Sequence, residues 1–212
     1  MPDNGWLVSG STSIEEIRGY YDDQASTYDR TLASWGYDAP RQVARLLMSI
    51  RGDGSRHTVL DAGCGTGLAG QAMRDAGFDG RLLGVDLSPD SVALAIARGI
   101  YDEVVIGDLQ QPLRRPDRSV DAVVCVGVLT YLPDVAAIWA EFCRVTRPGG
   151  SIVLTQRDDV WRERRCNEVL HDLERNGRWT VCHLSPPSSY LPGNADFGEQ
   201  IRVRYMAARV RR

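Results

Sequence analysis

The sequence contains no lysine, so all 25 of its basic residues are arginine. Its 28 acidic residues leave a formal net charge of −3 at pH 7. The chain therefore lacks the excess of positive charge that recruits nucleic acid or an anionic lipid surface. Arginine clusters at 161–165 and 209–212 keep an RNA or tRNA substrate open as an alternative. Such clusters are more often a solvated face, and we expect no nucleic-acid partner.

Cysteine is sparse, and long apolar runs are missing. The five cysteines are scattered, with no C-x-x-C pair, which fits neither a disulfide framework nor a metal site. The first residues show neither the basic nor the apolar region of a signal peptide. The longest apolar stretch, 122–129, is too short to cross a bilayer. We expect a cytoplasmic protein without metal or membrane partner, and the residues do not indicate its oligomeric state.

The length of 212 residues suits a single domain, 1–212. Within it we expect a flexible start at 1–12, a helical N-terminal lid at 13–50 and a core at 51–212. Buried parallel strands are short and rich in Val, Leu and Ile. Segments of this kind occur at 57–62, 81–86, 103–108, 119–126 and 151–156.

Helical segments alternate with these strands. A capping box at Ser13 predicts a short first helix, and a second follows Pro40. Further helices are expected at 68–77, 88–99, 133–150 and 160–177. Alternation of this kind predicts an α/β fold with a doubly wound, mostly parallel sheet. Two last strands, 178–185 and 199–210, have no helix between them and predict an antiparallel hairpin at one edge.

The stretch VLDAGCGTGLAG, residues 59–70, carries two overlapping glycine motifs. From Gly65 it reads G-x-G-x-x-G, the dinucleotide fingerprint, in which a pyrophosphate rests on the helix N-terminus. From Asp61 it reads D-x-G-x-G-x-G, and a carboxylate there would repel that phosphate. S-adenosylmethionine has no phosphate and carries a cationic sulfonium, so Asp61 suits it better. Glycine still lets the backbone pass close to the ligand.

The ends of the next two strands favour the same cofactor. Asp86 can accept hydrogen bonds from ribose hydroxyls, which NAD shares with S-adenosylmethionine. Asp108 is placed to accept the adenine amino group, with Leu109 beside the ring, and the nicotinamide interpretation gives these residues no role. We therefore predict S-adenosylmethionine, with S-adenosylhomocysteine as product. An NAD-binding oxidoreductase stays an alternative.

At this point the sequence resembles the class I, seven-stranded S-adenosylmethionine-dependent methyltransferases. It is most similar to small members near the ubiquinone/menaquinone-type and Williams–Beuren-region methyltransferase-like proteins. The resemblance rests on the segments YYDDQASTYD, WGYDAP, VLDAGCGTG, GVDLSPDSVALAIARG, GDLQQPL, VGVLTYLPD and RVTRPGG. It implies a Rossmann-like sheet of order 3-2-1-4-5-7-6 with an antiparallel last strand.

The resemblance also implies a cofactor site. The glycine loop would hold the methionine part, and the carbonyls closing the fourth strand would face its ammonium group. Lid tyrosines would reach its carboxylate. The residues implied are Tyr21, Tyr28, Asp61, Gly63, Cys64, Gly65, Gly67, Asp86, Leu87, Asp108, Leu109, Cys125 and Val126.

For the acceptor we expect a small, aromatic or heterocyclic molecule of natural-product type, for instance an indole, methylated on O, N or C. Predicted acceptor-binding residues are Tyr20, Trp35, Tyr131, His183 and Tyr190. Among the histidines, the expected topology puts only His183 at the substrate side, where its ordinary pKa of about 6.5 would suit a general base. Tyr21 could share this catalytic role. A catalytically inactive, cofactor-binding regulatory domain is a further alternative.

Overall fold

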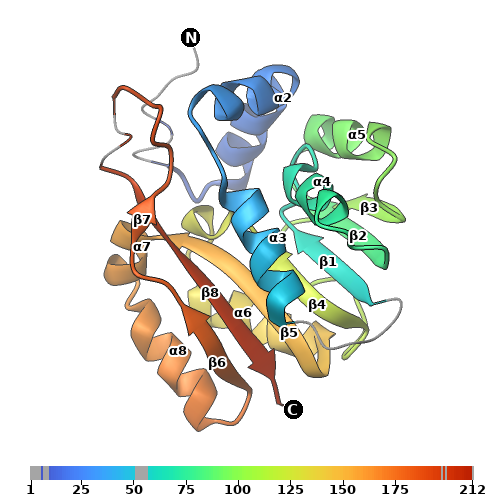
Figure 1. Cartoon of the computed structure of the whole chain (residues 1–212), viewed down its shortest axis with the longest axis vertical. Helices are drawn as coiled ribbons and strands as arrows, with labels where there is room; N and C mark the ends of the chain where they lie inside the picture. The colour runs from blue at the N-terminus through green and yellow to red at the C-terminus, as the bar shows by residue number, and fades with distance from the viewer. Residues whose placement is uncertain (1–5, 7–9, 51–56, 197, 199, 212) are drawn as a thin grey trace.

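A computed structural model of the chain describes residue 6 and residues 10–50, 57–196, 198 and 200–211. It contains one eight-stranded sheet, with helices on both faces (Figure 1). The strands are β1 (Thr58–Ala62), β2 (Arg81–Asp86), β3 (Glu103–Ile106), β4 (Val120–Cys125), β5 (Thr146–Arg157), β6 (Trp179–Leu184), β7 (Ser188–Ser189) and β8 (Arg202–Val210). The expected flexible start, 1–12, falls largely on residues 1–5 and 7–9, which lie outside the described residues.

The strand order confirms the doubly wound fold. It runs β3-β2-β1-β4-β5-β8-β6, with β7 paired to β8. Strands β1 to β5 pair in parallel, whereas β8 is antiparallel to β5 and to β6. Since β8 is the seventh of the predicted strands, this is the expected order. The two-residue β7 is too short to leave a hydrophobic pattern and was not predicted.

Helices cover both faces of this sheet. They are α2 (Ile14–Ser34), α3 (Ala39–Ile50), α4 (Leu68–Asp75), α5 (Pro89–Ala97), α6 (Val135–Val145), α7 (Asp158–Glu163) and α8 (Cys166–Arg175), with a 3-10 turn, η1 (Leu129–Tyr131). Within the described part of the chain, none of these helices has the length and apolar character needed to cross a membrane.

Alternate residues of each strand point to opposite faces, which makes two apolar layers. In β1, Val59 packs in a cluster with Met73 of α4 and with residues of α3. Its neighbour Leu60 belongs to a second cluster with Trp139 of α6 and residues of α8. The inner strands β1, β2, β4 and β5 are therefore buried on both sides, whereas the edge strands β3 and β6 are largely exposed.

Two element boundaries correct the expectation. Helix α6 ends at Val145 and β5 begins at Thr146, so the predicted helix to 150 and strand start at 151 are wrong. A residue that precedes proline disfavours the helical region, and Arg147 precedes Pro148. Thr146 instead pairs with Val120 of β4. At its other end β5 extends through Arg157.

The helical predictions change in two further places. The segment expected as one helix at 160–177 is divided into α7 and α8 at Arg165, whose φ of 52° is left-handed. Helix α2, expected to be short, runs for 21 residues. It thus carries Tyr21 and Tyr28 on one face, two turns apart, over the carboxyl ends of the parallel strands, where ligands bind in this class of sheet.

Candidate active site

A cleft opens at the carboxyl ends of β1 to β4, beneath α2. Most of the cofactor residues expected from the sequence line it. They are Tyr21, Tyr28, Gly63, Cys64, Gly65, Asp86, Leu87, Asp108, Leu109 and Val126. The structure thus brings together residues from the lid helix and from the ends of four strands.

The glycine loop shapes the floor of this cleft. Gly63, Gly65 and Gly67 have φ values of 77°, 52° and 97°, a region that side chains with a Cβ rarely adopt. A Cβ on Gly63 would lie 2.2 Å from a methyl carbon of Val128, so this position excludes other residues. A Cβ on Gly65 would meet no atom within 4 Å, which leaves open space above the loop.

Three predicted cofactor residues lie behind the lining. Asp61 and Cys125 are fully buried. Gly67 is the N-cap residue of α4 and lies against the side chain of Arg98. The hydroxyl of Tyr101 donates to Asp61 Oδ2 at 2.6 Å, while Asp61 Oδ1 is buried without a hydrogen bond. Burial raises the pKa of Asp61 to about 7.

The remaining carboxylates of the cleft are held by backbone amides. Asp86 accepts from Gly65 N at 2.7 Å and from Ser88 N at 3.0 Å, and burial raises its pKa. Asp108 accepts from Gln110 N at 2.8 Å. With Asp61 behind them, these groups give the cleft an acidic character that suits a cationic ligand.

Hydrogen bonds join the lid helix α2 to two of the turns that line the cleft. Asp22 accepts from Ser88 Oγ at 2.5 Å, in the turn after β2. Asp29 accepts from Thr66 Oγ1 at 2.5 Å in the glycine loop and pairs with Arg98. These polar contacts hold α2 over the space in front of Gly65.

A second cavity adjoins the cleft. We call it the tyrosine cavity, because five tyrosines line it together with Leu32, Gly127, Thr130, Arg157, Leu191 and Ile201. The five are Tyr21, Tyr28, Tyr37, Tyr131 and Tyr190. All but Tyr190 also line the cleft, so the two spaces share a wall.

The tyrosines come from distant parts of the chain. Tyr37 precedes α3, and its hydroxyl lies 3.2 Å from that of Tyr190 in the segment after β7. A Cβ on Gly127 would come within 2.9 Å of both hydroxyls, so glycine at the end of β4 admits this pair. Burial raises the pKa of each cavity tyrosine. Their hydroxyls therefore stay protonated at neutral pH.

The predicted acceptor residues fall into two groups. Tyr131 and Tyr190 line the tyrosine cavity, whereas Tyr20, Trp35 and His183 line neither space. Tyr20 stacks on Trp6 at 4.7 Å between ring centroids. Trp35 packs in an apolar cluster beneath the end of α2.

His183 lies away from the cleft and from the tyrosine cavity. It lies on the edge strand β6 with an exposed side chain, opposite Ala207 of β8. Ala207 in turn pairs with Val153, in the middle of β5 rather than at its carboxyl end. The register therefore separates His183 from both cavities, and its expected role as general base has no geometric support.

Tyr37 and Arg157 are among the residues of the tyrosine cavity that the predicted site does not contain. Arg157 is 9% exposed and is the last residue of β5. The signal that could have found it is the rule already applied to Asp86 and Asp108, that a polar residue closing a buried strand faces the ligand edge.

Comparisons with known proteins agree with this geometry. A family model described as a methyltransferase domain matches residues 60–154. The human methyltransferase-like protein 27 is 35% identical over 194 residues, covering 86% of this chain and 78% of that protein. The malonyl-[acyl-carrier protein] O-methyltransferase of Serratia marcescens is 33% identical, but the alignment covers only 62% of its length and 69% of this chain.

Solved structures show the same fold. One is a methyltransferase in complex with the Haloferax volcanii Trm112 methyltransferase activator. It superposes with a TM-score of 0.64 at 19% identity, over 91% of this chain and 98% of that one.

The chain belongs to the class I S-adenosylmethionine-dependent methyltransferases. It is thus a methyltransferase that uses S-adenosylmethionine, and the NAD alternative is set aside. The site fits this ligand: carboxylates line the cleft, which suits a cationic molecule, and the space next to Gly65 is open.

Proposed function

We propose that this enzyme methylates a small aromatic or heterocyclic molecule that binds in the tyrosine cavity. The observation that carries the proposal is the shared wall of tyrosines between this cavity and the cofactor cleft. Aromatic rings favour stacked or edge-on contacts with flat ligands, and their hydroxyls orient polar groups.

Each end of the cofactor has matching residues. Asp86 would accept the ribose hydroxyls, and Asp108 and Leu109 would bracket the adenine. Tyr21 and Tyr28 of the lid would reach the methionine carboxylate. When bound, S-adenosylmethionine supplies a methyl group on a cationic sulfur that is already activated for displacement.

The protein's contribution to the reaction would be positioning. Burial is the main cause of the raised pKa values of the cavity tyrosines, Tyr21 included. Because their hydroxyls keep the proton, these tyrosines are disfavoured as general bases. With His183 on the exposed edge strand, orientation of the acceptor and exclusion of water beneath α2 are the effects that remain. Such positioning can supply a large share of a displacement barrier.

Substitution of Tyr190 tests the assignment of the acceptor site. Tyr190 lines the tyrosine cavity but not the cleft, so Tyr190→Phe should raise the acceptor KM and leave cofactor affinity unchanged. Loss of one hydrogen bond predicts a rise of roughly 3- to 10-fold. The readout is S-adenosylhomocysteine release over a panel of phenols, indoles and aromatic acids, beside calorimetry with S-adenosylhomocysteine.

Tyr205→Phe is the matched control, because Tyr205 lies on β8 and lines neither space. Tyr205→Phe should change neither the acceptor KM nor the affinity for the cofactor. Turnover with RNA and with no member of the small-molecule panel would contradict the proposal. So would a Tyr190→Phe variant that loses cofactor affinity instead.

A further inference from the structure

Tyr101 lies in the loop between α5 and β3, and its side chain reaches the end of β1. Its hydroxyl donates to Asp61 Oδ2 at 2.6 Å, and its ring packs on the apolar layer that contains Met73 and Phe78. The side chain is half-buried and lines neither the cleft nor the tyrosine cavity. Tyr101 therefore contacts the cofactor site from behind, through Asp61.

Two glycines of the G-x-G-x-x-G pattern leave the space that this side chain occupies. Gly70, the third glycine of the pattern, lies within α4. A Cβ on Gly70 would lie 2.3 Å from the hydroxyl oxygen of Tyr101. A Cβ on Gly67 would lie 3.2 Å from a carbon of the same ring. The absence of side chains at these positions thus lets the hydroxyl of Tyr101 reach Asp61.

Asp61 depends on a side-chain donor, whereas Asp86 does not. Asp86 accepts from the backbone amides of Gly65 and Ser88, which the loops themselves supply. Among the described residues, Tyr101 is the one side chain that donates to Asp61, and Asp61 Oδ1 is buried without a hydrogen bond. A buried carboxylate keeps its charge only where hydrogen bonds or opposite charges stabilise it.

The titratable groups that interact with Asp61 come from the elements around it. They are Tyr101, Cys64 of the glycine loop, Asp86 of β2 and Cys125 of β4. Burial raises the pKa of Asp61 to about 7, and the charge of Asp86 acts in the same direction. The hydrogen bond from Tyr101 is the main opposing effect, followed by the backbone amide of Gly70. Both thiols stay neutral, because burial raises their pKa.

We propose that Tyr101 is a positioning residue of the cofactor site and acts through Asp61. Its hydroxyl holds this carboxylate beneath the glycine loop in the charged form that a cationic ligand favours. The proposal concerns the cofactor and does not depend on which acceptor is methylated. S-adenosylhomocysteine lacks the sulfonium charge. Tyr101 should therefore strengthen binding of S-adenosylmethionine more than binding of this product.

Tyr101→Phe tests the role of the hydroxyl, because it keeps the ring. Without its donor, Asp61 should hold its proton to higher pH. At pH 7 the affinity for S-adenosylmethionine should fall by about 3- to 10-fold, and that for S-adenosylhomocysteine should fall less. At pH 9 Asp61 is ionised in both proteins, so their affinities should agree within about twofold. Calorimetry with the full chain gives these values.

The ligand-free protein gives a second readout. After labelling of the aspartates with ¹³C, the carboxyl signal of Asp61 is identified by its loss in Asp61→Asn. The titration midpoint of this signal should move to higher pH in Tyr101→Phe. Gly70→Ala should move it in the same direction, because the added Cβ displaces the hydroxyl of Tyr101. This variant also provides the measurement should Tyr101→Phe fail to fold.

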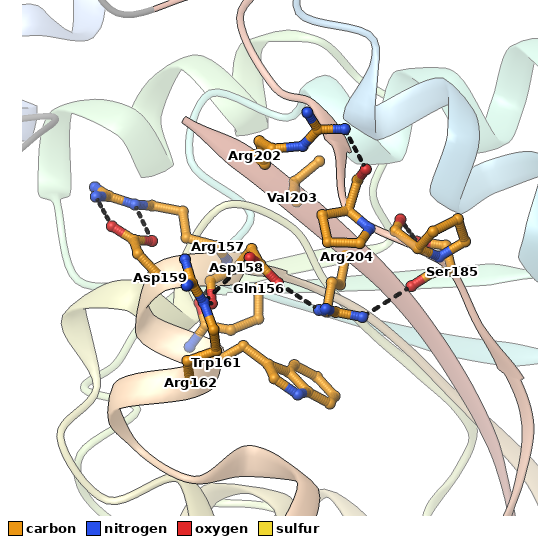
Figure 2. Close-up of polar contacts among 12 residues, drawn as sticks. Gln156, Arg157, Asp158, Asp159, Trp161, Arg162, Ser185, Arg202, Val203 and Arg204 are labelled. Atoms are coloured by element: carbon orange, nitrogen blue, oxygen red, sulfur yellow. Dashed lines mark hydrogen bonds and ion pairs between the residues drawn. The ribbon is translucent and has the colours of Figure 1, made fainter. Parts of the chain in front are cut away.

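Tyr205→Phe is the matched control, because Tyr205 is also half-buried and packs on the same apolar layer as Tyr101. Its backbone amide donates to Ser185 Oγ at 3.0 Å. Figure 2 shows the neighbouring Arg204 bound to Asp158 and to the carbonyl of Ser185. These contacts hold this part of β8 without the hydroxyl of Tyr205. The control should therefore change neither the midpoint nor the affinities.

Two results would overturn the proposal. An affinity that falls equally at pH 7 and pH 9 in Tyr101→Phe would leave Tyr101 with a packing role alone. A midpoint of Asp61 that is the same in the wild type, Tyr101→Phe and Gly70→Ala would show that the hydroxyl does not control the charge of this carboxylate.

Discussion

Asp61 is the residue whose charge should respond most to the cofactor. It is fully buried at the end of β1, two residues before the lining Gly63, and burial raises its pKa to about 7. Near neutral pH the free protein therefore holds this carboxyl partly protonated. A cation bound in the cleft favours the charged form, so binding should release a proton.

Cofactor affinity should consequently rise between about pH 6 and pH 8, as Asp61 loses its proton. Calorimetry in two buffers of different ionisation enthalpy measures the proton release directly. Asp61→Asn should flatten the pH dependence and weaken binding of S-adenosylmethionine more than that of the uncharged thioether S-adenosylhomocysteine. An affinity for S-adenosylmethionine that does not change across this pH range would exclude Asp61 as the responding group.

The same group sets a pH dependence of folding stability. Its folded pKa is raised above the ordinary value of 3.8, so the folded state binds the proton more tightly than the unfolded chain. This contribution is complete below about pH 4 and is lost as the pH rises through about 7. Asp61→Asn carries no charge at any pH. In the absence of ligand it should melt above the wild type at pH 8, with a smaller gap at pH 5.

At the scale of elements, helix α2 covers the cleft, and its contacts with the turns beneath it hold it in place. Asp22 and Asp29 lie seven residues apart on one face of the helix. Each accepts a hydrogen bond from a hydroxyl group in a different turn beneath the helix. In Figure 1 the helix lies over the ends of the strands, beside α5. Its position therefore depends on polar contacts at the surface of the site.

Removal of one contact should loosen the lid. Asp29→Asn loses the charge that pairs with Arg98, so we expect faster hydrogen exchange in α2 and S-adenosylhomocysteine binding weakened by about 3- to 10-fold, with a faster off-rate. Stopped-flow binding and exchange mass spectrometry measure both. Asp23→Asn changes an exposed carboxyl of the same helix and is the control. Equal exchange in the two variants would mean that Asp29 does not hold the lid.

The elements differ in how far the sequence predicts them. Gly63, Asp86 and Asp108 end or follow apolar strand segments at regular spacing, so the local pattern predicts their place at the cleft. The tyrosine cavity has no such pattern, because Tyr37 and Tyr190 are 153 residues apart and meet only in the fold. In the sequence, Arg157 comes directly after the predicted end of its strand, where an arginine on the surface would give the same pattern. His183 depends on strand register, which alternating residues alone do not determine.

At the scale of the molecule, several arginines bind carbonyl and carboxylate groups of the same chain. The cluster at 161–165 illustrates this, since Arg164 donates to the carbonyls of η1 and Arg165 pairs with Glu168. Near the C-terminus, Arg209 donates to Gly149 O and Ile50 O. Together with the net charge of −3, these contacts argue against a broad cationic surface on the described part of the chain. We therefore keep the proposal of a small acceptor over one of RNA.

The salt dependence of the reaction separates these two substrates. A protein that contacts six to ten phosphates loses about 10³- to 10⁵-fold in affinity between 50 and 200 mM salt, because counterions are released on binding. A small acceptor makes few ionic contacts and releases few ions, so its KM should change by less than about threefold over this range. Initial rates of S-adenosylhomocysteine release, with the accepted panel member and with bulk transfer RNA, give the comparison. A steep salt dependence, together with methylation of the RNA, would reverse the assignment of the acceptor.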